Sequence, residues 1–126
     1  MVDSLHAPSP TRVVPYAKGV DLDASRAFYT EVLGFEVAME DPILALASPT
    51  NHSAQVLVPP PGFDDPQPQF GIDLGDPKAV DAAHTAAVQR GLRVVYALRD
   101  EPWGVRRFFV EDPSGTIINV LAHTAA

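Results

Sequence analysis

The stretch DLDASRAFYTEVLGFEV, residues 21–37, decides the architecture because it holds a complete helix and the start of the strand that follows. An aspartate at its beginning, Asp21 or Asp23, is a typical N-cap. Three apolar residues recur at helical spacing: Ala24, Phe28 and Val32. Gly34 stands where a glycine typically ends a helix. The pattern predicts a helix of about three turns that leads directly into a strand.

The same order of elements returns in the second half of the chain. A second helix is predicted from Asp76, its N-cap, with Pro77 at the first helical position, to Gly91. Its core-facing residues are expected to be Val80, Ala83, Ala87 and Leu92. Strands are predicted at 12–20, 35–40, 43–48, 54–58, 70–74, 92–98, 105–111 and 116–122. The prediction is an α+β fold of two βαβββ repeats, whose paired curved sheets surround a cleft.

The length of 126 residues is typical of one domain. We expect a polar N-terminal tail at 1–11 and a single domain at 12–126. Within that domain, repeats 12–58 and 69–123 are joined by a proline-rich connector at 59–68, PPPGFDDPQP. The two halves are predicted to pair within one chain or to swap between two chains.

The composition argues against several classes of function. Hydrophobic residues make up 46% of the chain and charged residues 20%, which is typical of a folded protein. The formal net charge of -7 argues against nucleic acid as a partner, because binding to a phosphate backbone needs basic side chains. The chain has no cysteine, which excludes disulfides and thiolate metal sites. No apolar run approaches the roughly 20 residues that cross a bilayer, so we expect a cytoplasmic protein without a membrane partner.

Two segments resemble the vicinal oxygen chelate superfamily, the glyoxalase/bleomycin resistance protein/dioxygenase fold. They are residues 21–37 and EPWGVRRFFVEDPSGTIINV, residues 101–120, whose turn Asp112-Pro113-Ser114-Gly115 leads into the last strand. The resemblance extends from about Arg12 to His123. It implies the fold predicted above, and a homodimer.

Enzymes of this superfamily hold a divalent metal with His, Gln or Glu side chains on four strands. The resemblance places those positions at Val14, near Gln55, at or near Gln69, and at Asn119. A valine and three neutral amides are a poor donor set, because first-row metals prefer imidazole or carboxylate ligands. We therefore expect a metal-free branch of the family, with no metal and no cofactor.

The first hypothesis is a binding protein that sequesters a small apolar or aromatic molecule, such as an antibiotic, as drug-binding members of the family do. Strand alternation favours Arg107 over Arg106 as the inward arginine, although we expect a surface salt bridge for either. Trp103, alone in its loop, is a candidate for the rim of the cleft. The predicted ligand-binding residues are Tyr16, Gln55, Gln69, Trp103, Arg107, Phe109 and Asn119.

Two alternatives remain open at this point. One is a metal-dependent lyase, isomerase or dioxygenase-type enzyme of the same superfamily, whose non-standard site would use Gln55, Gln69, Asp73 or Glu111. Asp73 and Glu111 are also its candidate general bases. The other is an interaction domain with a collapsed cleft. The residues decide neither whether a reaction is catalysed nor which ligand is bound.

Overall fold

The computed structural model describes residues 9–124, so most of the predicted tail at 1–11 lies outside the described part. The described residues form two compact units. Unit 1 contains 9–13 and 68–124, and unit 2 contains 14–67. Strand β1 (Arg12–Pro15) begins in unit 1 and ends in unit 2.

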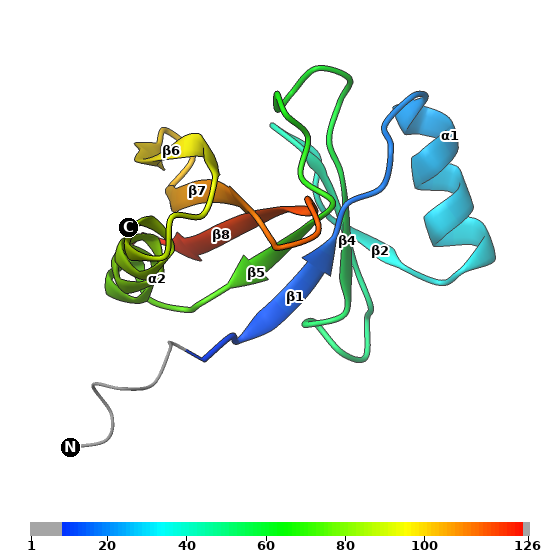
Figure 1. Cartoon of the computed structure of the whole chain (residues 1–126). Helices are drawn as coiled ribbons and strands as arrows, with labels where there is room; N and C mark the ends of the chain where they lie inside the picture. The colour runs from blue at the N-terminus through cyan, green and yellow to red at the C-terminus, as the bar shows by residue number, and fades with distance from the viewer. Residues whose placement is uncertain (1–8, 125–126) are drawn as a thin grey trace. The chain divides into compact units, whose positions relative to one another are not determined.

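Unit 2 is a three-stranded antiparallel sheet with one helical run (Figure 1). The run consists of α1 (Leu22–Ala27) and a π-helical segment, η2 (Phe28–Val32). The sheet follows in the order β2 (Glu36–Met39), β3 (Leu44–Ala47) and β4 (Gln55–Val58). Its core is Leu44, Leu46 and Val58, against which Leu22 and Tyr29 of the helical run pack.

Unit 1 contributes the remaining elements (Figure 1). They are β5 (Phe70–Asp73), α2 (Pro77–Gln89), β6 (Val94–Glu101), β7 (Val105–Glu111) and β8 (Ile117–His123). The five-stranded sheet has the order β1-β5-β8-β7-β6, with β5 and β8 parallel and β6, β7 and β8 antiparallel. Two sheets and the βαβββ order confirm the predicted α+β fold class.

The core of unit 1 lies between α2 and one face of this sheet. Val80 and Ala87 of α2 are buried against Phe108, Val120 and Ala122. Ile72 and Leu74 pack into the same cluster, as strand alternation indicates. The prediction for Leu92 is wrong: this residue follows the end of the helix and is 38% exposed.

Local signals explain where both helical runs begin and end. Oδ1 of Asp21 accepts a hydrogen bond from Ala24 N at 3.0 Å, and Oδ1 of Asp76 accepts one from Lys78 N at 2.9 Å. These contacts confirm the predicted N-caps. Gly34 and Gly91 have φ of 77° and 69°, the left-handed conformation in which a glycine terminates a helix without strain.

The first strand is shorter than predicted. It ends at Pro15, and only an isolated bridge between Tyr16 and Leu57 continues it. Proline has no N–H to donate to a ladder, so the pairing stops there. Beyond it, Gly19 is so close to Pro59 that a Cβ would lie 2.1 Å from the Pro59 carbonyl oxygen. Within residues 9–124, no helix has the length and apolar composition needed to cross a membrane.

Candidate functional site

The face of the five-stranded sheet opposite α2 carries the polar chemistry of unit 1. Strand register arranges its side chains in rows that run across the strands. One row is Asp73, Leu121, Arg107 and Arg99, and the next is Gly71, Asn119, Phe109 and Tyr96. A third, at the hairpin end of β6 and β7, is His123, Val105 and Glu101. We call this surface the face opposite α2.

Buried polar side chains are concentrated on this face. The described residues contain four buried polar or charged side chains, and all four belong to these rows: Asp73, Glu101, Arg107 and Asn119. The opposite face, under α2, is apolar throughout its core. Burying a charge is costly unless it is paired and hydrogen-bonded, so the charged side chains among them need partners on this face.

Glu101 and Arg107 form a buried ion pair. The Nε of Arg107 lies 2.7 Å from Oε2 of Glu101, and the two side chains are only 5% and 2% exposed. Arg99 places its Nε 3.1 Å from Oε1 of the same carboxylate, and the hydroxyl of Tyr96 donates to Oε2. One carboxylate thus receives two guanidinium groups and a phenol. With two arginines and one glutamate, this cluster has a surplus of one positive charge.

Three aromatic rings surround the guanidinium of Arg107. Its Cζ lies 4.9 Å from the ring centroid of Tyr96, 5.2 Å from that of Trp103 and 4.8 Å from that of Phe109. Tyr96 and Phe109 stack with their centroids 4.4 Å apart. These distances are within the range of cation–π attraction. Trp103, at 39% exposure, is the ring of this group that is most accessible to solvent.

A second ion pair lies at the other edge of the same face. Arg12 Nε is 2.8 Å from Oδ2 of Asp73, while Oδ1 of Asp73 accepts a hydrogen bond from Gly75 N at 2.8 Å. Arg12 Nη2 is 3.1 Å from Nε2 of His123. Because arginine only donates, His123 accepts here through Nε2. Asp73 therefore uses both oxygens to fix β1 and the turn that enters α2, which assigns it a structural role.

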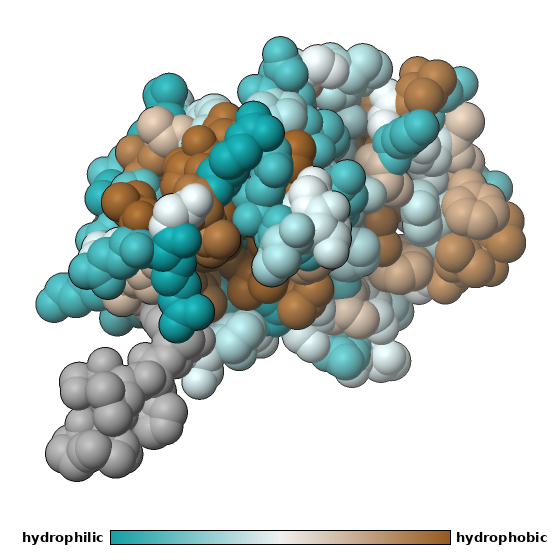
Figure 2. Space-filling model, viewed as in Figure 1, coloured by the Kyte–Doolittle hydropathy of each residue, from teal (hydrophilic) through white to brown (hydrophobic). Residues whose placement is uncertain are grey.

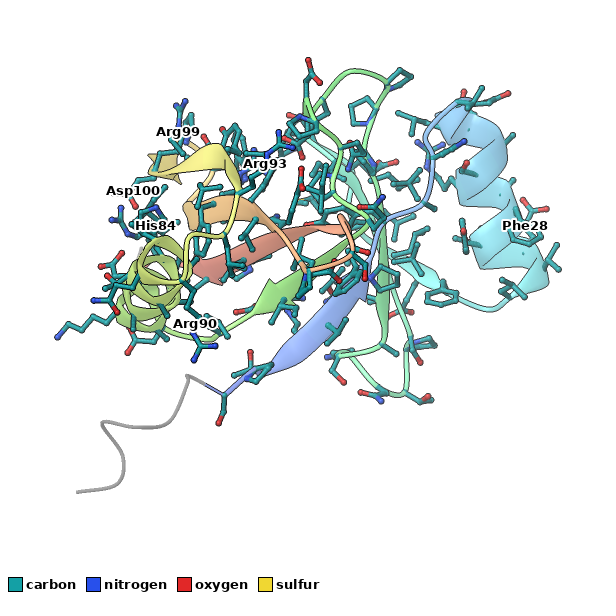
Figure 3. All side chains as sticks on the ribbon, viewed as in Figure 1. Phe28, His84, Arg90, Arg93, Arg99 and Asp100 are labelled. Carbon is teal, nitrogen blue, oxygen red and sulfur yellow. The ribbon has the colours of Figure 1, made fainter. Side chains whose placement is uncertain are left out.

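Arg106 and Arg107, neighbours on β7, have different environments. Arg106 lies on the α2 side and pairs with Asp81 at 2.7 Å and Asp100 at 3.1 Å. Its hydrogen bond to Asp81, followed by that to Asp100, raises the pKa of Arg106 above its ordinary value. The expected surface salt bridge is therefore correct for Arg106 and wrong for Arg107, whose partner is buried. Figure 3 shows Asp100 and Arg99 at the outer end of β6.

The structure brings some of the predicted ligand-binding residues together. Trp103 and Phe109 both contact Arg107, and Asn119 is the register partner of Phe109. Gln69 is exposed at the start of β5, where its Oε1 accepts a hydrogen bond from Ile117 N at 2.8 Å.

The two predicted residues of unit 2 have local contacts of their own. Tyr16 forms its bridge with Leu57, and Nε2 of Gln55 donates to the carbonyl of His52 at 3.0 Å. Tyr16 and Gln55 therefore stay predictions as ligand contacts.

Sequence reasoning missed two members of the cluster, Tyr96 and Glu101. Tyr96 occurs in the apolar run LRVVYAL, where a core position is the ordinary interpretation. Glu101 is the last residue of β6, and its partner Arg107 follows on the next strand. Opposite charges flanking a short hairpin were the one available signal, because cross-strand neighbours pair in this way.

The described residues do not fit the divalent metal that the family resemblance implies. Val14 offers no donor atom and is 1% exposed. The amides of Gln55 and Gln69 are engaged with backbone groups, and Asn119 supplies an amide rather than a carboxylate. Within residues 9–124, no three His, Cys, Asp or Glu side chains gather closely enough to hold a metal ion.

Solved structures with the same fold come from proteins of several kinds. A glyoxalase/bleomycin resistance protein/dioxygenase superfamily member from Vibrio splendidus 12B01 matches with a TM-score of 0.63 and 22% identity, over 88% of this chain and 97% of that one. Methylmalonyl-CoA epimerase from Mycobacterium tuberculosis matches with a TM-score of 0.73 and 20% identity, over 92% and 90%. An extradiol ring-cleaving dioxygenase from B. fuscum matches with a TM-score of 0.70 and 25% identity, over 94% of this chain and 34% of that one.

These likenesses bear on the fold and leave the activity of this chain open. No curated protein matches the chain in sequence. The sequence model of one family, however, matches residues 19–120, which is most of the chain. The chain belongs to the Glyoxalase/Bleomycin resistance protein/Dioxygenase superfamily.

Proposed function

We propose that this protein binds a small planar aromatic molecule at the face opposite α2, without a metal. The observation that carries the proposal is that, besides the structural Asp73, the described residues bury the Glu101–Arg107 pair and Asn119 on this one face. Ligand sites are typically apolar surfaces with a few fixed polar groups. A purely structural sheet face would reach the same stability with apolar residues alone.

The geometry supports stacking as the mode of binding. Trp103 is the accessible ring, and Arg107 lies against its face, held by Glu101. A flat ligand on the outer surface of Trp103 would extend this stack, and large rings give contact area at low cost in entropy. The surplus positive charge from Arg99 and Arg107 favours aromatic acids and phenols over aromatic amines. Sequestration of an aromatic antibiotic would be one use of such a site.

A calorimetric titration tests the proposal with size-matched benzoate, benzyl alcohol and benzylamine derivatives. We expect the acid to bind more tightly than the amine, and Trp103→Ala to weaken binding by about tenfold or more, as loss of a central aromatic contact does. Leu92→Ala is the matched control, because Leu92 is an apolar residue of the same unit with nearly the same exposure, 38% against 39%. Unchanged affinity in Trp103→Ala would overturn the assignment of this face.

The competing function is a metal-dependent lyase, isomerase or dioxygenase-type enzyme of the same superfamily. It needs a donor set that residues 9–124 do not assemble. Elemental analysis after incubation with zinc, nickel, manganese or ferrous iron and gel filtration separates the two functions. Metal near one equivalent per chain would refute metal-free binding.

The expected assembly and location also stay proposals. We infer a homodimer from the family resemblance, and we propose a cytoplasmic location as the default expectation from the sequence. Sedimentation at several concentrations measures the assembly, and fractionation of cells measures the location.

A further inference from the structure

The helical run of unit 2 has apolar residues on two faces. Leu22 and Tyr29 point to the sheet and pack on its core. Two of the residues whose spacing predicted this helix are instead accessible, since Phe28 is 48% and Val32 68% exposed, and Leu33 beside them is 53% exposed. We call Phe28, Val32 and Leu33 the outer stripe. Figure 3 shows Phe28 on the outer side of the run, and Figure 2 shows brown and tan groups gathered there.

The apolar surface continues onto the neighbouring strand. β2 contacts η2, and its residues Val37 and Met39 are each 39% exposed. β2 is also an edge of its three-stranded sheet. Five large apolar side chains close together in the chain are therefore accessible. Exposed large apolar side chains that gather on neighbouring elements mark an interaction site more often than scattered single residues do.

The unit that carries the outer stripe is acidic. Unit 2 has eight acidic side chains against two basic ones, Lys18 and Arg26. Arg26 is already engaged, with Asp23 at 2.9 Å and Glu40 at 2.9 Å. Among the described residues, Glu31, which lies between Phe28 and Val32 in sequence, and Glu36, which follows Leu33, have no basic partner. The surface is thus an apolar stripe next to carboxylates whose charge is not balanced.

We propose that the outer stripe docks a basic amphipathic helix of another protein. The apolar face of such a helix would cover Phe28, Val32 and Leu33, in the manner of an amphipathic helix on an apolar surface. Its Lys or Arg side chains would pair with Glu31 and Glu36. A symmetric contact with a second copy would bring the same carboxylates of both copies together, which is repulsive. An anionic membrane is disfavoured for the same reason.

Fluorescence anisotropy with labelled synthetic peptides tests the proposal on the full chain. The probe is a helix of about 18 residues made of leucine and lysine, with leucines at the i, i+3, i+4, i+7 positions. A peptide with glutamate in place of lysine is its matched control. We expect the leucine–lysine peptide to bind, more weakly as salt is raised, and the leucine–glutamate peptide not to bind.

Matched variants distinguish docking at the outer stripe from nonspecific binding of the peptide. Val32→Ser should weaken binding of the leucine–lysine peptide by about tenfold, whereas Val88→Ser should leave it unchanged, since Val88 is a 57%-exposed valine on α2. Glu31→Gln with Glu36→Gln should reduce the salt dependence. Equal effects of Val32→Ser and Val88→Ser would overturn the proposal. So would a concentration-dependent dimer that Val32→Ser abolishes, because the stripe would then belong to a second copy.

Discussion

Removing one partner of the buried pair Glu101–Arg107 should lower the free energy of unfolding of the protein. Glu101→Leu leaves the guanidinium of Arg107 buried, with its side chain 5% exposed, and deprives it of the carboxylate at 2.7 Å. Breaking a buried ion pair in this way costs about 3–5 kcal/mol. The three rings around Arg107 keep part of their attraction for the cation, which places the expected loss near 3 kcal/mol.

Arg107→Met should cost less. The carboxylate of Glu101 then retains Arg99 at 3.1 Å and the hydroxyl of Tyr96, so its charge stays solvated by donors. The loss should be about 1–3 kcal/mol, the range for a buried polar group that loses one partner. With both substitutions together, no buried charge is left without a partner, because Arg99, which also loses Glu101, is 57% exposed to water. The double variant should lie within about 1 kcal/mol of the parent protein, because apolar residues of similar volume replace buried ion pairs at little cost.

Urea denaturation followed by circular dichroism measures these free energies, with m-values compared among the variants. In a thermal scan, Glu101→Leu should lower Tm by about 10 °C for a chain of this length. The double-mutant cycle gives the coupling directly. If Glu101→Leu cost less than about 1 kcal/mol, or if adding Arg107→Met failed to restore stability, the interpretation of this cluster as a buried, mutually dependent pair would be refuted.

Three further predictions concern the turns and caps of unit 1. Hydrogen bonds from the backbone N–H groups of Thr116 and Ser114 lower the pKa of Asp112 from its ordinary value of 3.8. The contribution of the ionised Asp112 to stability is therefore present above that value and is lost as pH falls through the lowered pKa. Asp112→Asn should lower Tm at pH 7, and the difference in Tm from the parent protein should vanish in acid. Gly75→Ala should lower the free energy of unfolding by more than the roughly 1–2 kcal/mol of a left-handed alanine, because φ is 78° and the new Cβ would lie 2.8 Å from Cγ2 of Thr11. Adding Thr11→Ser removes that methyl group and should restore part of the lost stability in urea denaturation. If it restores none, the clash with Thr11 is excluded. Asp76→Ala should cost about 1 kcal/mol in the same assay through loss of the α2 N-cap, and an unchanged midpoint would show that the cap contributes nothing.

Strand alternation predicted that Arg106 and Arg107 point to opposite faces of β7, and the structure confirms it, since Arg106 pairs with Asp81 of α2 and Arg107 pairs with Glu101. It could not identify the partner of Arg107. Glu101 lies on the preceding strand, and the ladder between β6 and β7 contains register shifts between Val94 and Tyr96 and between Tyr96 and Arg99. A shift of one residue reverses the face of every later side chain, so the sequence alone cannot place Tyr96 and Glu101 beside Arg107.

The helical run of unit 2 was also predicted in part from the sequence: its position was predicted, but the face that packs on the sheet was not. Periodicity and Gly34 predicted the run, and the structure confirms it. The residues that gave the pattern, Phe28 and Val32, are nevertheless exposed, and Tyr29 packs on the sheet instead. Apolar residues occupy two faces of this helix, so the pattern itself contains no information about which face meets the core.

By itself, the sequence determined the order of the helices and strands, their caps and stops, and the family, since these depend on residues close together in the chain. Only the tertiary structure decided that β1 joins the sheet of β5 to β8, that Glu101 and Arg107 pair among three rings, and that the outer stripe of unit 2 stays exposed. Each of those outcomes depends on contacts between distant residues, and strand register and packing fix such contacts after the local elements have formed.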